Sequence, residues 1–243
     1  MTWEGDIQVC NAFNEHFASV GRRINEAFGE SEIQYTSRET VTNSIYLSGV
    51  TELEVSSMIL SMKNKKCDIS VYPNSILKSI HIIVAPIIAH IIGVSFREGA
   101  FPQSLKSARV VPIFKNGDDG DVNNYRPISV LPLLSKLFER AMYNRLVSFI
   151  DKYKLLSNSQ YGFRKGMSTS HAIMDNLDFV FRNLDQGKVV LSMFLDFKKA
   201  FDCVEHDILL VKLWNYGVRG SAYDWLASYL SNRDQYMSVN GVN

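Results

Sequence analysis

One stretch constrains the fold of this chain more than any other: a short apolar run that stops at a carboxylate. Residues 189–196 read V-V-L-S-M-F-L-D and follow a Gln-Gly-Lys turn signal at 186–188. A run this short, beginning with β-branched residues, predicts a buried strand over 189–195 rather than a helix. An aspartate at the end of a buried strand is often found at the mouth of a cleft. Asp196 is therefore a candidate for chemistry, although a role as the cap of the following helix explains it equally well.

Composition places the chain among ordinary globular proteins. Its 243 residues are 46% hydrophobic, which is enough for one large domain or two small ones. A net charge of +1 means that any binding of nucleic acid has to come from local basic patches. Three scattered cysteines without a CxxC pair predict a reducing compartment, nucleus or cytoplasm, and no zinc site. The first residues carry acids and no apolar signal segment, so we expect an intracellular protein that is not secreted.

Helical periodicity recurs on both sides of a β-rich region. The apolar stretch 76–96 is interrupted by charged residues and a proline, which favours a buried helix, apolar nearly all round, over a membrane span. Thr51 and Glu54 predict a capping box at the start of another helix. The apolar stripes of the helices are expected to face inward. Helices are predicted over 10–28, 51–63, 76–99, 133–149, 171–184, 208–214 and 222–230, and strands over 108–115, 125–131, 189–195 and 236–240.

The two strands over 108–115 and 125–131 are joined by a polar loop rich in Gly, Asp and Asn, which predicts an antiparallel hairpin. Pro112 interrupts the first strand and predicts that it is an edge strand or is bent.

Two cations flank the loop of this predicted hairpin. Lys115 at the entry and Arg126 at the exit would lie side by side, where they could hold a polyphosphate. The alternative is a solvated hairpin tip whose own acids neutralise the cations, and the residues alone leave both interpretations open. These acids are Asp118, Asp119 and Asp121.

A second polar loop, 157–170, interleaves glycine, aromatic and basic residues in the order Q-Y-G-F-R-K-G at 160–166. Such loops can stack on single-stranded nucleic acid and follow its backbone. A surface turn with buried anchors is the alternative.

Four stretches together resemble the reverse transcriptase of non-LTR retrotransposons of the jockey and LINE type. They are A-R-V-V-P-I-F-K-N-G-D at 108–118, N-Y-R-P-I-S-V-L-P at 124–132, Q-Y-G-F-R at 160–164 and L-D-F-K-K-A-F-D at 195–202. The sequences F-N-E-H-F at 13–17 and G-A-F-P at 99–102 are similar to the segment that precedes the polymerase fingers in this family. The resemblance therefore covers nearly the whole chain.

The resemblance implies an α+β chain with the right-hand polymerase fold. A helical N-terminal extension would occupy 1–103 and an incomplete reverse transcriptase domain 104–243. Within that domain the fingers would take 104–188 and a partial palm 189–243, and the thumb would be absent.

The resemblance also assigns roles to single residues. It implies that Asp196 is the first palm carboxylate, which with the backbone carbonyl of Phe197 helps to hold two Mg²⁺ ions for nucleotidyl transfer. Phe201 would lie under the incoming sugar and screen against a 2′-hydroxyl. Lys115 and Arg126 would contact the triphosphate of the dNTP.

The substrates implied by the resemblance are an RNA template, a DNA primer and dNTPs. The interrupted apolar stretch at 76–96 separately predicts that no membrane is involved. The template would be contacted in the fingers by Gln160, Gly162, Phe163 and Arg164.

The sequence departs from the family in one essential respect. The palm of the family also carries an aromatic-Ala-Asp-Asp turn, which completes the metal site, and the 243 residues do not contain it. The one Asp-Asp pair, Asp118-Asp119, is expected to be a solvated turn. We therefore expect no polymerase activity from this polypeptide alone, and association with a chain that supplies the remaining palm and thumb.

Two alternatives remain at this stage. A binding module would grip RNA or a template-primer duplex without chemistry, with the loop at 160–165 and the basic residues Lys63, Lys65, Lys66, Lys106 and Arg109. A hydrolase using Asp196 and Asp202 is weaker, because it leaves the hairpin and the Gly-Phe-Arg loop unexplained.

Overall fold

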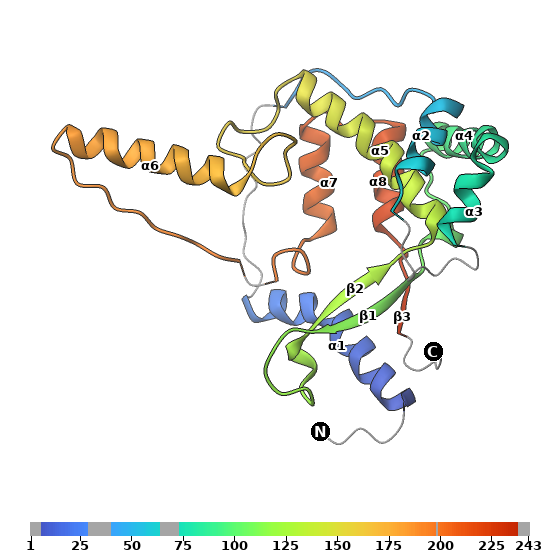
Figure 1. Ribbon diagram of the computed structural model, residues 1–243, viewed down its shortest axis with the longest axis horizontal. Coiled ribbons are helices and arrows are strands. Elements are labelled where there is room, and N and C mark those ends of the chain that lie inside the picture. Colours follow the sequence, from blue (N-terminus) through green and yellow to red (C-terminus); the bar gives the residue numbers. More distant parts are fainter. Residues whose placement is uncertain (1–5, 29–39, 64–72, 198, 238–243) are drawn as a thin grey trace. The chain divides into compact units, whose positions relative to one another are not determined.

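The fold mixes helices with a small sheet, as predicted for the α+β class (Figure 1). A computed structural model describes residues 6–28, 40–63, 73–197 and 199–237. In these ranges eight α-helices and three strands are found. The helices are α1 (Asp6–Phe28), α2 (Glu52–Ser61), α3 (Asn74–Ser79), α4 (His81–Glu98), α5 (Leu133–Lys152), α6 (Thr169–Asp185), α7 (His206–Asn215) and α8 (Ser221–Leu230); the strands are β1 (Ala108–Phe114), β2 (Tyr125–Val130) and β3 (Gln235–Met237). Two 3₁₀ turns, η1 (Gln103–Leu105) and η2 (Val122–Asn124), precede β1 and β2.

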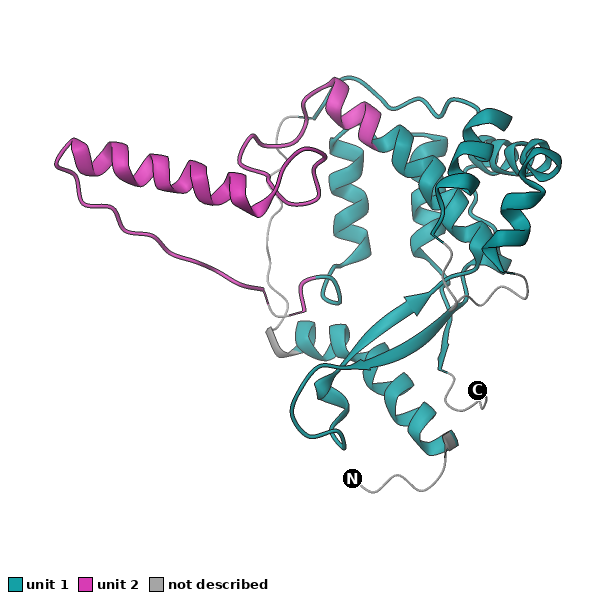
Figure 2. Ribbon diagram, viewed as in Figure 1, with its two compact units in different colours: residues 1–146, 201–243 teal, residues 147–200 magenta. Residues whose placement is uncertain are grey.

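The chain divides into two compact units (Figure 2). Unit 1 comprises residues 1–146 and 201–243, and unit 2 comprises residues 147–200. The predicted division at 103/104 follows the family resemblance, and it stays a prediction.

The main core of unit 1 is built by α2, α4, α5 and α8. Trp225 of α8 is 1% exposed and meets the rings of Phe96 and Phe101 edge to face, with centroids 5.8 and 5.2 Å away. Its indole N–H donates to the Ser95 hydroxyl at 2.9 Å, so burying the ring leaves no unsatisfied donor. Helices from both sides of the β-rich region thus share one apolar cluster.

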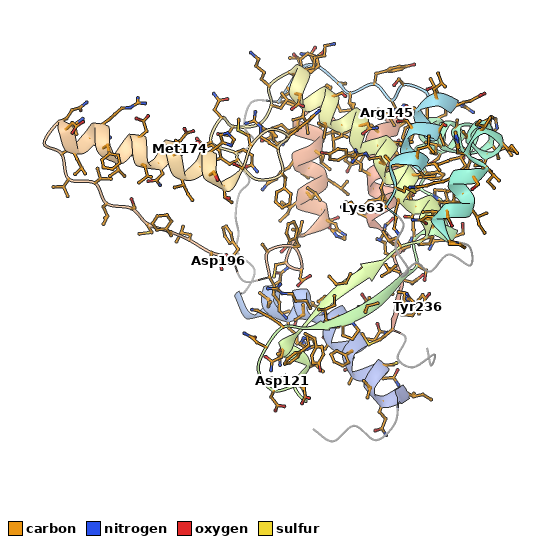
Figure 3. All side chains as sticks on the ribbon, viewed as in Figure 1. Lys63, Asp121, Arg145, Met174, Asp196 and Tyr236 are labelled. Carbon is orange, nitrogen blue, oxygen red and sulfur yellow. The ribbon has the colours of Figure 1, made fainter. Side chains whose placement is uncertain are left out.

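A single arginine ties α5 to the start of α2. Arg145 donates to both carboxylate oxygens of Glu54, at 2.9 and 3.0 Å, and to the carbonyls of Ser48 and Gly49 at 2.9 and 2.8 Å (Arg145 is labelled in Figure 3). The Thr51 hydroxyl accepts from the Glu54 N–H at 3.1 Å, which confirms the predicted helix cap. The hydrogen bonds from Arg145 lower the pKa of Glu54 below its ordinary value of 4.5, although burial opposes them.

The sheet of unit 1 has the strand order β2-β1-β3, with β2 antiparallel and β3 parallel to β1. The hairpin prediction is therefore confirmed, but β1 is the central strand, not an edge. Pro112 is tolerated because β3 pairs only with 108–110, and Pro112 lies opposite Pro127 of β2, beyond that pairing. Helix α1 packs on this sheet through Cys10 and Phe13, which cluster with Val110 and Met237.

The apolar stretch after residue 76 differs from its prediction in two ways. It forms two helices, because Ile80 leaves helical geometry (φ −107°, ψ 14°) between α3 and α4. Helix α4 ends as predicted, with Gly99 in the left-handed conformation at φ +63°. It is not buried all round: one face joins the core, while Ile83 and Ile87 are exposed.

Helix α4 is long and apolar enough to cross a membrane. It is the one helix of the described ranges that meets this criterion of length and composition. The core helix of a globular protein passes the same test, and α4 supplies Ile88, Ile92 and Phe96 to the core of unit 1. The absence of a membrane stays a prediction.

Unit 2 contains the end of α5, a loop, helix α6 and an extended segment (Figure 2). Helix α6 forms where the sequence predicts it, and Ser168 caps it by accepting from the His171 N–H. Its apolar side chains do not face inward, however, since Ile173, Met174, Leu177, Phe181 and Leu184 are all exposed.

The predicted buried strand over 189–195 is wrong for this structure. Residues 188–197 are extended but belong to no sheet, and their apolar side chains are exposed, from 96% at Val189 to 79% at Leu195. A strand needs hydrogen-bonding partners, and none of the three described strands pairs with residues 188–197, although β2 and β3 each keep one unpaired edge.

Candidate functional site

The tip of the β1–β2 hairpin is the best-formed part of the predicted site. In its register, Ile113 lies opposite Arg126 and Phe114 opposite Tyr125. The Lys115 N–H donates to the carbonyl of Asn124 at 2.8 Å, which extends the ladder by one residue. Lys115 and Arg126 are therefore diagonal neighbours on one face of the hairpin, because side chains two residues apart on a strand share a face.

Both cations are available to a ligand. The side chains of Lys115 and Arg126 are exposed, and neither makes a side-chain hydrogen bond or ion pair with any residue that the structure describes. Two like charges held on one face repel each other, and an anion between them removes that cost. The register therefore places the two cations on one face of the hairpin, and their role in holding a polyphosphate stays a prediction.

Two of the acids in the loop accept hydrogen bonds from backbone N–H groups of the loop itself. Asp118 Oδ1 accepts from the Gly120 N–H, and Asp121 Oδ1 from the Asn123 N–H, both at 2.9 Å. The Asn123 backbone N–H, followed by the Asn123 side chain, lowers the pKa of Asp121 (labelled in Figure 3). Asp118-Asp119 is thus a turn, as predicted, and neither it nor Asp121 forms an ion pair with Lys115 or Arg126.

The sequence reasoning missed the residues that support this loop. Tyr125 donates its hydroxyl to the Asp119 carbonyl at 2.9 Å. Its ring meets Phe13 of α1 edge to face, with centroids 4.8 Å apart. An aromatic residue directly before Arg126 was the available signal, but its partner lies more than a hundred residues away in the sequence.

In unit 2, the loop predicted to bind the template is held closed by its own polar groups. Arg164 donates to the carbonyls of Ser157 and Gln160, at 3.1 and 3.3 Å, and the Gln160 amide donates to the Gly162 carbonyl at 3.0 Å. Phe163 lies between them with a left-handed backbone, φ +59°, and is 90% exposed. A non-glycine residue in this conformation is strained, and such strain is frequent at ligand-binding loops.

The predicted catalytic segment is also in unit 2 and is not assembled. Asp196 and Phe197 lie on the extended, exposed part of the chain, where Figure 3 labels Asp196. Among the described residues no three His, Cys, Asp or Glu side chains come together as a metal ligand set. One carboxylate and one carbonyl do not fit a two-Mg²⁺ site by themselves.

The remaining predicted residues belong to unit 1. Phe201 is exposed and lies in a turn at the first position of the second segment of unit 1, residues 201–243. The next residue, Asp202, lies so close to α1 that a Cβ on Gly21 would stand 1.9 Å from the Asp202 carbonyl oxygen. Asp202 and Asp196, the pair required by the hydrolase alternative, thus belong to different units.

Among the basic residues of the binding-module alternative, Lys63 is exposed, whereas Lys106 is buried and Arg109 half-buried. Lys65 and Lys66 lie outside the described residues.

Comparison with known proteins gives a consistent result. The model of the family "Reverse transcriptase (RNA-dependent DNA polymerase)" matches residues 113–242, more than half of the chain. The RNA-directed DNA polymerase from mobile element jockey of Drosophila melanogaster is 32% identical over 200 residues, which are 82% of this chain and 22% of the relative.

Two further Drosophila melanogaster relatives agree with this match. The probable RNA-directed DNA polymerase from transposon BS is 33% identical over 66% of this chain and 18% of its own length. The corresponding protein of transposon X-element is 30% identical over 74% of this chain and 20% of its own length. The chain therefore spans about a fifth of the length of these relatives.

Proposed function

Because the chain belongs to the reverse transcriptase family and is related to the enzymes of jockey-type non-LTR retrotransposons, we propose that it carries the nucleotide-binding and template-binding part of an RNA-directed DNA polymerase. Its substrates are then a dNTP and an RNA template annealed to a DNA primer. In this proposal residues 104–188 are the fingers and 189–243 part of the palm of a right-hand fold, and 1–103 are a helical N-terminal extension. The protein acts inside the cell, in the nucleus or cytoplasm.

The observation that carries the proposal is the cation pair at the hairpin tip. Lys115 and Arg126 share one face of a rigid ladder and make no side-chain bond to a described residue. A triphosphate presents several oxygens that accept charge-assisted hydrogen bonds from an ammonium and a guanidinium group. We assign the triphosphate of the incoming dNTP to this face.

The loop at 160–164 takes the template in this proposal. Phe163 supplies the aromatic surface on which an unpaired base stacks, a contact that contributes about 1–3 kcal/mol per base. Arg164 and Gln160, whose polar groups bind the carbonyls of the loop itself, keep Phe163 in position rather than meet the nucleic acid. A Cβ at Gly162 would meet no atom within 4 Å, so the position before Phe163 is open to the template.

The polymerase chemistry is proposed only for a complete site. Asp196 and the Phe197 carbonyl would contribute two of the ligands for Mg²⁺, and Phe201 would lie under the sugar. Since the 243 residues hold one carboxylate motif and no Ala-Asp-Asp turn, we propose that this polypeptide alone does not polymerise. Activity would require association with a segment that supplies the other palm carboxylates and the thumb.

Titration of a fluorescent dNTP against the whole chain tests the nucleotide site. Lys115→Ala and Arg126→Ala should each weaken binding at least about tenfold, because a hydrogen bond to a charged group contributes about 1.5–3 kcal/mol. Arg22→Ala is the matched control, since it removes an exposed cation from α1 and should leave the affinity unchanged. Equal affinity in all four proteins would refute the assignment.

A primer-extension assay with Mg²⁺ tests the predicted inactivity. The purified chain should incorporate no dNTP above an Asp196→Ala control. Incorporation that depends on Asp196 would overturn this part of the proposal.

One observation favours a second candidate function, a module that binds RNA or a template-primer duplex without chemistry. Phe163 is presented on a closed loop, while Asp196 belongs to no carboxylate cluster of the described residues. RNA binding that weakens with salt, with no measurable dNTP binding, would support this candidate over the first.

A further inference from the structure

Lys106 is a buried cation that the proposed nucleotide site does not use. It follows η1 and is 4% exposed. Its side chain makes no hydrogen bond or ion pair with any residue in the described ranges. Burial lowers the pKa of Lys106, and the charge of Arg233 lowers it further. The Lys106 Nζ is not among the described polar atoms that are both fully buried and unpaired, so the amine reaches the surface while its stem is buried. A largely buried cation without a counter-charge is costly, so its presence needs an explanation.

Arg233 is held beside Lys106 by the backbone. The Gln103 amide donates to the Asn232 carbonyl at 3.0 Å, and the Ala108 N–H donates to the Asp234 carbonyl at 2.9 Å, so the two segments run together. The Arg233 guanidinium donates to the Tyr229 carbonyl at 3.0 Å and stands 4.6 Å from the centroid of the Tyr229 ring. A guanidinium has five N–H donors, and this contact uses one of them.

The acid near Lys106 and Arg233 does not neutralise their two positive charges. Glu139 is a carboxylate whose charge reaches Arg233, but it makes no ion pair with a described residue. Its Oε1 accepts from the hydroxyls of Tyr229 and Ser135, at 3.0 and 3.4 Å, and burial raises its pKa. Burial, followed by the charge of Glu139, raises the pKa of Tyr229 to about 12. The charge of Glu139 acts on Arg233 and also on Lys136, and no described acid forms an ion pair with Lys106.

We propose that Lys106 and Arg233 form a binding site for a backbone phosphate of the template-primer, a site separate from the hairpin tip. A phosphate oxygen accepts from the compact ammonium group and from the planar guanidinium at once, which supplies the missing negative charge. This proposal rests on the nucleic-acid binding proposed above.

The position along β1 favours a polymer over a single nucleotide. Lys106 precedes β1 and Lys115 follows it, and the seven residues of the strand between them span about 20 Å at about 3.3 Å per residue. One dNTP on the hairpin tip does not reach across that length, whereas a strand of nucleic acid presents a phosphate at every residue.

The test is the salt dependence of template-primer binding by the whole chain, measured for the unaltered protein, Lys106→Met and the control Arg22→Met. A lost phosphate contact should lower the slope of log K against log salt concentration by about 0.7–0.9. We expect this decrease and roughly five- to tenfold weaker binding for Lys106→Met only. Lys106→Arg, which keeps the charge, should retain the slope.

Urea unfolding of the same free proteins separates a binding role from a structural one. Lys106→Met removes an unpaired cation, so its unfolding midpoint should equal or exceed that of the unaltered protein. A lower midpoint together with weaker binding would assign Lys106 a structural role and overturn the proposal. So would an unchanged salt slope in a protein that binds template-primer normally.

Two further outcomes identify the ligand. If inorganic phosphate raises the unfolding midpoint of the unaltered protein but not that of Lys106→Met, while the salt slopes are equal, the site takes a free anion and not the nucleic-acid backbone. If the unaltered protein binds no template-primer at all, the proposed function fails, and the assignment to a backbone phosphate fails with it.

Discussion

Two segments of this chain have the same sequence signature and different structures. Residues 108–114 and 189–195 are both short apolar runs that begin with β-branched or small residues, and both predict a strand. The first is β1, the central strand of a sheet, and the second is extended, unpaired and exposed. A candidate nucleotide-binding residue follows the first run, and the candidate metal ligand follows the second.

The difference lies in where the hydrogen-bonding partners are. The partner of β1 is β2, ten residues further along, so a local loop brings the two together. None of the three described strands pairs with 189–195. An apolar run thus predicts that a segment is suited to a sheet, but the sheet forms only where the partners are present.

The helices repeat this contrast. α5 and α8 bury Leu137 and Trp225 in the core of unit 1, whereas α6, which is more amphipathic than either, leaves Phe181 60% exposed. Stability in this protein should therefore be concentrated in unit 1.

The largest expected effect compares two aromatic truncations. Trp225→Ala should lower the free energy of unfolding by about 3–5 kcal/mol, because it empties a packed site and leaves the Ser95 hydroxyl without its donor. Phe181→Ala should change it by no more than about 0.5 kcal/mol. Urea unfolding measures both free energies, with far-UV circular dichroism as the signal because Trp225 fluorescence is lost in one variant. Similar losses in the two variants would show that α6 packs as tightly as α8.

A smaller effect is expected from the clamp between α2 and α5. Arg145→Met leaves the Glu54 carboxylate and two carbonyls without their donor, which should cost about 2–4 kcal/mol. Because the folded-state pKa of Glu54 lies below its ordinary 4.5, the contribution of the pair is complete above that pH and is lost as the pH falls through the folded-state value.

The free energy of unfolding, measured between roughly pH 6 and pH 3, should therefore fall less steeply in Glu54→Gln than in the unaltered protein. Equal pH profiles would contradict the role of this pair.

The smallest effect compares two Gly→Ala substitutions, which should change the free energy of unfolding in opposite directions. Gly21→Ala places a Cβ against the Asp202 carbonyl and should destabilise the protein by about 1–3 kcal/mol. Gly93→Ala meets only the Arg97 side chain at 3.6 Å and should stabilise α4 by about 0.5–1 kcal/mol. Thermal unfolding of both variants checks the prediction, and stabilisation by Gly21→Ala would show that α1 does not approach residue 202.

Sequence reasoning succeeded where the determining contacts are local. The hairpin, the Thr51 cap and the end of α4 at Gly99 all depend on residues a few positions apart. It failed where the outcome depends on distant partners: the Glu54–Arg145 pair spans 91 residues, and residues 189–195 pair with none of the described strands. For the site, it predicted the neighbouring positions of Lys115 and Arg126 but not the support from Tyr125.

The central claim is that a formed hairpin, the proposed nucleotide site, coexists with an unformed segment around Asp196, the proposed metal ligand. Amide hydrogen exchange of the whole chain, followed by mass spectrometry, tests it most directly. The account predicts slow exchange for the paired amides of β1 and β2, further slowing at the hairpin tip when a dNTP is added, and exchange at the rate of an unstructured peptide over 189–197. Exchange over 189–197 as slow as in β1 would contradict the account, since it would mean that the buried strand predicted from the sequence exists.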